Sequence, residues 1–187
     1  MASAVSQLRN PTDTRELRRG FGAFPTGVTV LTCVGKDGSA VGMTASSFVS
    51  LSLSPPLVSV ALHKAARRLS AFVDSGTFTI NVLRADQHEL STMFARTCDS
   101  SWSEVRFSTT PTGHVLLNDA AACFICRLSA LHPVGDHVLL VGEVEKFSDD
   151  AHVEPLTFLR GRYGTFRPAA HTPVVDSIEQ WSATGWG

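Results

Sequence analysis

The residues best suited to chemistry in this chain are hydroxyl side chains gathered in one run, GMTASSFVSLSLSPPLVSVAL, at residues 42–62. Thr44, Ser46, Ser47 and Ser50 supply hydroxyls among small residues, whose backbone N–H groups a ligand can reach. Such groups suit a phosphate or the polar edge of a flat ring. The run therefore indicates a bound cofactor, and the alternative is a Ser/Thr-rich strand at the edge of a sheet.

Basic and imidazole side chains elsewhere extend this set. Lys64, Arg67 and Arg68 follow the strand-like LVSVAL, where we expect them to open a helix and to bring positive charge and helix N-terminal amides to a phosphate. His137 stands at a turn that enters a strand, where an imidazole can contact a substrate amide. The only tyrosine, Tyr163, lies between two glycines. A solvated basic helix start and a histidine that faces water are the alternatives.

Several familiar catalytic patterns are absent from the sequence. No G-x-G-x-x-G follows a strand and no G-x-x-x-x-G-K-[ST] occurs, which excludes a Rossmann dinucleotide site and a P-loop. His88-Glu89 begins like H-E-x-x-H but lacks the second histidine, and no serine stands in G-x-S-x-G. Cys123 and Cys126 form a C-x-x-C in a strand-like run, where residues three apart point to opposite faces. We interpret them as ordinary apolar residues and expect no metal site.

The elements that must position these groups are mostly short strands. The sequence predicts strands at 28–34, 40–43, 46–54, 57–62, 77–83, 123–134 and 137–147, with turn signals at Asp37-Gly38, Pro55-Pro56 and Gly135-Asp136. Helices are expected over 12–24, before Gly76, and around Leu90, Met93 and Phe94. Gly142, inside a strand, indicates a bulge or a close backbone approach. Hairpins with few helices predict a mainly β fold with peripheral helices, an antiparallel barrel in preference to a parallel α/β sheet.

Length and composition fit one domain with short extensions. We place an N-terminal extension at 1–12, the domain at 13–167 and a C-terminal tail at 168–187. A net charge of −1 and scattered basic residues argue against nucleic-acid binding. The sequence has no apolar leader and no run of about 18 apolar residues, so we expect a soluble, cytoplasmic protein. Its four cysteines are expected to be reduced.

A resemblance to the flavin reductase family rests on motifs that occur in the family's order. They are FGAFPTGVTVLT (21–32), the run at 42–62, FTINVL (78–83), FA (94–95), GDHVLLVGEVE (135–145) and PLTFLRGRYG (155–164). T-A-S-S-F with S-P-P-L, combined with G-D-H and G-E-V, is the specific part. The family comprises the small reductase components of two-component flavin-dependent monooxygenases.

The resemblance implies a flavin-binding split β-barrel that works as a homodimer, with FAD or FMN near the interface. It implies that the isoalloxazine ring and ribityl chain are bordered by Pro25, Thr26, Gly27, Val28, Met43, Thr44, Ala45, Ser46 and Ser47. By the same resemblance, the phosphate or adenylate side is held by Ser50, Ala61, Leu62, His63 and Lys64. His137 and Tyr163 would lie near the nicotinamide and the flavin ring. Members often carry a basic residue, sometimes after Asn, where this chain has His63-Lys64.

The implied activity is hydride transfer from NADH or NADPH to flavin, with release of reduced flavin to a partner monooxygenase. Hydride transfer requires no general acid, so His137 is expected to orient the nicotinamide and no acid/base residue is expected. FAD and NADH are favoured, although no residue decides between FAD and FMN or between NADH and NADPH. A tight flavin-binding protein and an enzyme like pyridoxamine-phosphate oxidase on a related barrel are the alternatives.

Overall fold

The computed structural model describes residues 8–96 and 102–168 of the chain. Cys98, Trp181, Trp186 and most of the two predicted extensions lie outside these ranges. In the described residues the strands are β1 Thr26–Gly27, β2 Thr29–Val34, β3 Ala40–Ala45, β4 Val49–Leu53, β5 Pro56–His63, β6 Thr77–Val82, β7 Phe107–Thr109, β8 Val115–Leu117, β9 Ala122–Val134, β10 His137–Asp149, β11 Leu156–Leu159 and β12 Arg162–Thr165. The helices are α1 Thr14–Phe21, α2 Leu69–Ser75 and α3 His88–Ala95, with a 3₁₀ turn at Trp102–Glu104.

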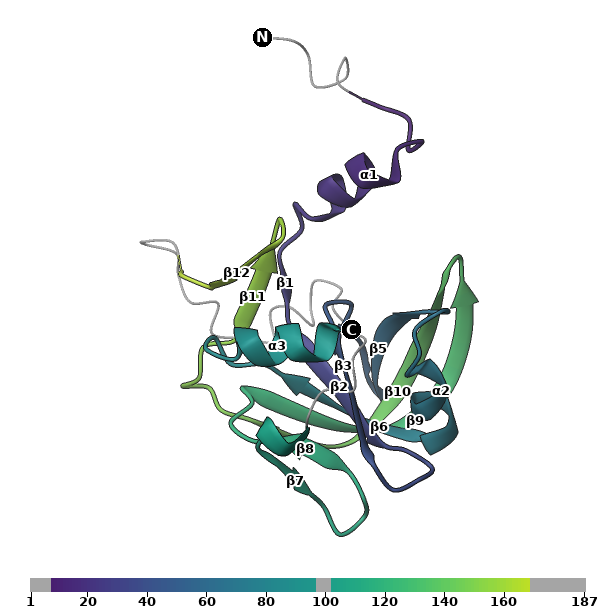
Figure 1. Cartoon of the computed structure of the whole chain (residues 1–187), viewed down its shortest axis with the longest axis vertical. Helices are drawn as coiled ribbons and strands as arrows, with labels where there is room; N and C mark the ends of the chain where they lie inside the picture. Colours follow the sequence, from purple (N-terminus) through teal and green to yellow (C-terminus); the bar gives the residue numbers. More distant parts are fainter. Residues whose placement is uncertain (1–7, 97–101, 169–187) are drawn as a thin grey trace.

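The fold is mainly β with peripheral helices, as the sequence predicted. Seven strands form one antiparallel sheet in the order β3-β2-β6-β9-β10-β5-β4. A smaller sheet has the order β1-β11-β12, and β7 pairs with β8. Helix α3 packs against β3 and β2, whereas α2 packs against β2 and β6. Figure 1 shows α1 standing apart from this body, at the N-terminal end of the described chain. No helix among the described residues is long and apolar enough to cross a bilayer.

Strand β2 is buried on both faces and separates two apolar cores. Its odd positions, among them Leu31 and Cys33, enter a core that includes Phe72 of α2. Val28 and Val30 face the opposite way, into a core that includes Phe94 of α3. Successive side chains of a strand alternate between faces, so one strand serves both cores. The two cores fix α2 and α3 on opposite faces of the strand that precedes the hydroxyl-rich run.

The predicted hairpins are confirmed. Gly35 N donates to Ser39 O at 2.8 Å across the Asp37-Gly38 turn, and Gly38 adopts a φ of 81°. β9 and β10 form the long hairpin, with Gly135 at a φ of 56° in its turn. Gly142 meets both expectations, because the register shifts beside it and an added Cβ would lie 2.6 Å from Phe78.

Four local expectations were wrong. The first helix covers only Thr14–Phe21, although Asp13 caps it through N–H donors of Arg15 and Glu16. The strand expected at 46–54 is β4, Val49–Leu53, and it is largely exposed in this chain. α2 starts at Leu69, so Lys64, Arg67 and Arg68 precede the helix because the chain first makes a turn. No strand was predicted between 83 and 123, where the structure has β7 paired with β8.

Candidate functional site

Hydrogen bonds to the backbone hold the hydroxyls of Thr44 and Ser47. Thr44 lies near the end of β3, and Ser47 lies just after that strand. Thr44 Oγ1 donates to the backbone oxygen of Ser91 in α3 at 2.7 Å. Ser47 Oγ donates to Ala61 O at 2.9 Å and accepts from Ala61 N at 3.1 Å. A hydroxyl has one proton, so toward a ligand either oxygen can only accept. These bonds tie the hydroxyl-rich segment to α3 on one side and to β5 on the other.

Ser46 and Ser50 offer the hydroxyls that are free to donate. Both residues are exposed, and neither side chain has a hydrogen-bond partner within the described parts of the chain. Ser50 lies at a register shift between β4 and β5. Ser46 lies between β3 and β4, where the backbone leaves the sheet. Of the four hydroxyls at residues 44–50, these two are therefore the ones able to donate to a phosphate or a carbonyl oxygen.

The predicted segment 25–28 enters the body beside β11. Thr26 pairs with Phe158 of β11, and its Oγ1 is buried with no hydrogen-bond partner among the described residues. A buried hydroxyl without a partner costs free energy, which a ligand or a second chain can recover by bonding to it. Val28 is different, because its side chain is in the core and its backbone bonds to Leu156 and Leu83. Val28 can therefore support the site from the core but cannot contact a ligand through its side chain.

Tyr163 of β12 lies over α3. Its hydroxyl is 2.9 Å from Ser91 Oγ, and its ring stacks at a tilt against Phe158, with centroids 5.3 Å apart. The residue is 40% exposed, so part of its side chain is accessible to a ligand. The structure thus joins Tyr163 to Thr44 through a single residue, Ser91.

A second group of predicted residues gathers where β5 meets the β9–β10 turn. His137 is the cross-strand partner of His63, and the two rings meet edge to face with centroids 5.1 Å apart. Asp136 lies between them, 2.7 Å from His137 Nδ1 and 3.7 Å from His63 Nε2. Lys64 Nζ donates to Gly135 O at 2.6 Å and so fastens the turn to β5.

Asp136 sets the proton positions in this second group. The hydrogen bond from His137, with the charge of both imidazoles, lowers the pKa of Asp136. An ionised carboxylate only accepts, so His137 Nδ1 carries the ring proton toward it. Nε2 of neutral His137 is then left as an acceptor. Such an acceptor suits the N–H₂ of a carboxamide.

Two of the predicted basic residues form hydrogen bonds in different places. Lys64 bonds to the β9–β10 turn, and Arg68 bonds to β3. Arg68 Nη1 donates to Gly42 O at 2.8 Å, at the edge strand β3. Gly42 itself is needed for packing, because a Cβ there would lie 2.5 Å from the Phe94 ring. Leu62 of β5 is buried in the core, so its side chain cannot contact a ligand. Ser47, bonded to Ala61 two residues before His63, is the link between the two groups.

Sequence reasoning missed Ser91 and Asp136. Ser91 is 1% exposed within a helix, and no motif distinguishes it from other helical serines. Asp136 was treated only as a turn residue, although its position next to His137 is a usable signal. The three thiols in the described residues take no part, since Cys123 donates to Asn81, and Cys33 and Cys126 lie in the core that includes Phe72. The opposite-face prediction for the C-x-x-C is confirmed.

The fold and the site define a small, mainly β protein with polar groups along the segment that joins the two edge strands of its main sheet, and an imidazole pair on β5 and β10. Residues 21–167 match the flavin reductase like domain. The chain therefore belongs to the flavin reductase family.

Known proteins that it resembles include reductases of named function. A probable flavin reductase of Rhizobium meliloti is 40% identical over 157 residues, which are 84% of this chain and 50% of that protein. The reductase component of a flavin-dependent trigonelline monooxygenase of Acinetobacter baylyi is 36% identical, over 94% of this chain and 56% of that protein. The chain thus spans about half the length of these curated relatives.

Among solved structures, an NADH:FAD oxidoreductase of Streptomyces globisporus, in complex with NAD and FAD fragments, is 37% identical. It superimposes with a TM-score of 0.82, over 88% of this chain and 99% of that chain.

Proposed function

We propose that this chain is a flavin reductase that oxidises NADH and passes reduced flavin to a partner monooxygenase. The observation that carries this proposal is the His137–Asp136 pair, which leaves an imidazole acceptor beside the hydroxyl-rich segment. The family and the named relatives support the same reaction.

The flavin, FAD in preference to FMN, supplies hydride acceptance from the reduced nicotinamide when it is bound. The donor set of the site fits such a group: among the described residues, the buried hydroxyl of Thr26 has no partner, and the hydroxyls of Ser46 and Ser50 are free. We assign the ring and ribityl side to 25–27 and 43–47, and the phosphate side to Ser50, Ala61, His63 and Lys64. Backbone amides near Ala45 and Ser46 would favour negative charge developing on the ring.

His137 would orient the nicotinamide by accepting from its carboxamide at Nε2. Asp136 fixes the tautomer, and His63 restrains the ring from the side. Hydride transfer does not require a proton from His137, Asp136 or His63. We therefore expect binding and orientation to limit the reaction in variants at this pair.

We also infer a split barrel that works as a homodimer. The two edge strands β3 and β4 are consecutive in the chain, and Ser47 between them bonds to β5, as curvature toward closure requires. A hollow of 740 Å³ beside α1 and one of 510 Å³ beside Arg68 are lined by neither His137 nor Tyr163. A second copy would complete the site. A solution mass near that of one chain, measured by light scattering, would contradict the dimer.

The function is tested by mixing purified protein with NADH, then separately with NADPH, and following nicotinamide absorbance with and without added FAD or FMN. We expect oxidation of NADH that depends strictly on added flavin. A yellow protein that oxidises neither nucleotide would indicate the flavin-binding alternative. Permanently held flavin that passes electrons to oxygen would indicate the oxidase-like alternative.

A further inference from the structure

Ser91 is a buried residue of α3 whose two polar groups reach two separate parts of the proposed flavin site. Its backbone oxygen accepts from Thr44 Oγ1 at 2.7 Å, and its Oγ is 2.9 Å from the Tyr163 hydroxyl. Its own N–H donates along the helix to Gln87 O at 3.0 Å. At 1% exposure, Ser91 cannot touch a ligand.

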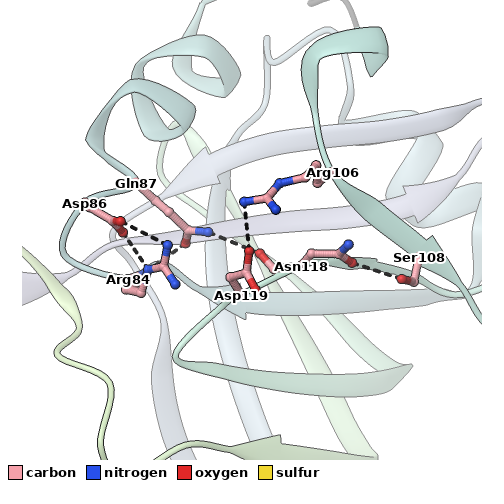
Figure 2. A network of polar contacts seen from close by, with 7 residues as sticks. All are labelled: Arg84, Asp86, Gln87, Arg106, Ser108, Asn118 and Asp119. Atoms are coloured by element: carbon pink, nitrogen blue, oxygen red, sulfur yellow. Dashed lines mark hydrogen bonds and ion pairs between the residues drawn. The ribbon is translucent and has the colours of Figure 1, made fainter.

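Helix α3 is held in place independently of these contacts. Figure 2 shows the polar network at its start, in which Arg84 binds Asp86 through two nitrogens and Gln87 Nε2 donates to Asn118 O at 3.2 Å. Arg106 pairs with Asp119 at 3.1 Å in the same network. Phe94 at the other end of α3 is buried in the core. The helix is therefore fixed at both ends and can serve as a rigid reference.

We propose that Ser91 is a positioning residue of the flavin site, which sets the distance between Thr44 on β3 and Tyr163 on β12. The proposal rests on the proposed function. β3 and β12 belong to different sheets, so no ladder hydrogen bond fixes their spacing. Within the described residues, the other ring and polar contacts of the Tyr163 side chain are His88, Phe158 and Thr92 Oγ1, the last at 3.5 Å. Ser91 Oγ is thus the short polar contact that fixes the phenol.

The first test needs no flavin. Because Tyr163 is the only tyrosine, protein labelled with ¹³C at the phenol carbon gives one tyrosine resonance. Ser91→Ala is expected to shift that resonance, and Glu89→Ala, which changes an exposed residue of the same helix, is expected to leave it in place. An unchanged resonance in Ser91→Ala overturns the proposed contact. This result stands even if the protein proves to bind no flavin, so it separates the inference from the proposed function.

The second test measures affinity for FAD and for FMN by fluorescence quenching. Loss of one hydrogen bond predicts an increase of about 3- to 10-fold in Kd for Ser91→Ala, with kcat at saturating flavin nearly unchanged. Tyr163→Phe should raise Kd similarly, and the double variant should be no worse than either single variant. Strictly additive increases, or no increase in either single variant, overturn the proposal. If Ser91→Ala does not fold, Tyr163→Phe decides it, because that side chain is partly exposed.

Discussion

At the scale of single residues, a hydroxyl can donate to a ligand only if its proton is not already donated to another group of the protein. The hydroxyls of Thr44 and Ser47 donate their protons to backbone oxygens, so these residues can shape the site but cannot donate to a ligand. Ser46 and Ser50 keep theirs. A sequence shows four equivalent hydroxyls, whereas the structure divides them into two that hold elements together and two that can donate to a ligand.

The orientation of nicotinamide is a prediction at this scale. His137→Ala removes the acceptor beside Asp136, so we expect kcat/KM for NADH to fall about 10-fold while flavin Kd stays nearly unchanged. Stopped-flow oxidation of NADH and flavin titration measure the two quantities. His152→Ala, which removes an exposed histidine from another turn, is the control. An NADH oxidation rate equal to that of the unaltered protein would refute the role of His137.

At the scale of elements, one buried amide joins four strands. Asn81 of β6 is fully buried, and its Nδ2 donates to Val30 O and to Thr32 Oγ1 of β2, both at 3.0 Å. Its Oδ1 accepts from Leu117 N of β8 at 2.9 Å and from Cys123 Sγ of β9. Through Asn81, the short β7–β8 pair is fixed to the main sheet below α3.

Asn81→Ala should therefore destabilise the fold. The change leaves Leu117 N–H buried without its acceptor, and we expect the free energy of unfolding to fall by about 2–4 kcal/mol in urea. Asn118→Ala removes an exposed amide and is expected to cost no more than about 0.5 kcal/mol. Equal losses in the two variants would show that Asn81 does not join the strands in this way.

At the scale of the whole molecule, folding buries three thiols: Cys33 and Cys126 lie in the core that includes Phe72, and Cys123 lies beside Asn81. Burial raises the pKa of Cys33 and of Cys126 from 9.0 to about 12, and that of Cys123 to about 11. The folded protein thus keeps three thiol protons that the unfolded chain releases above pH 9. Charged thiolates are excluded from the cores for the same reason that makes these cysteines unreactive.

Stability should fall on the alkaline side. Because the folded pKa values lie above the unfolded one, the unfolded chain binds fewer protons as the pH rises. Each thiol then lowers the free energy of unfolding by about 1.4 kcal/mol per pH unit above pH 9. Urea unfolding between pH 9 and about pH 10.5 measures this slope. Cys33→Ala should reduce the slope by about one thiol's share, and an identical slope would contradict the assignment.

The sequence by itself determined the fold class, the hairpins at Asp37-Gly38 and Gly135-Asp136, and the run that holds Thr44 to Ser50. These follow from local rules, since alternation, turn residues and small-residue runs act within a few positions along the chain. The sequence also indicated His137 by its turn.

Only the tertiary structure decided which groups meet. Ser91 joins Thr44 to Tyr163 across 72 positions of chain in one direction and 47 in the other, and nothing local encodes either pairing. The same holds for His63 and His137, which become partners because β5 and β10 are antiparallel neighbours. The prediction that the basic cluster opens a helix was wrong, because Lys64 and Arg68 precede α2 and their side chains donate to the distant backbone oxygens of Gly135 and Gly42. A side chain's role is set by its neighbours in space. Those neighbours depend on the register of the sheet, which is fixed by strands that lie far apart in the chain.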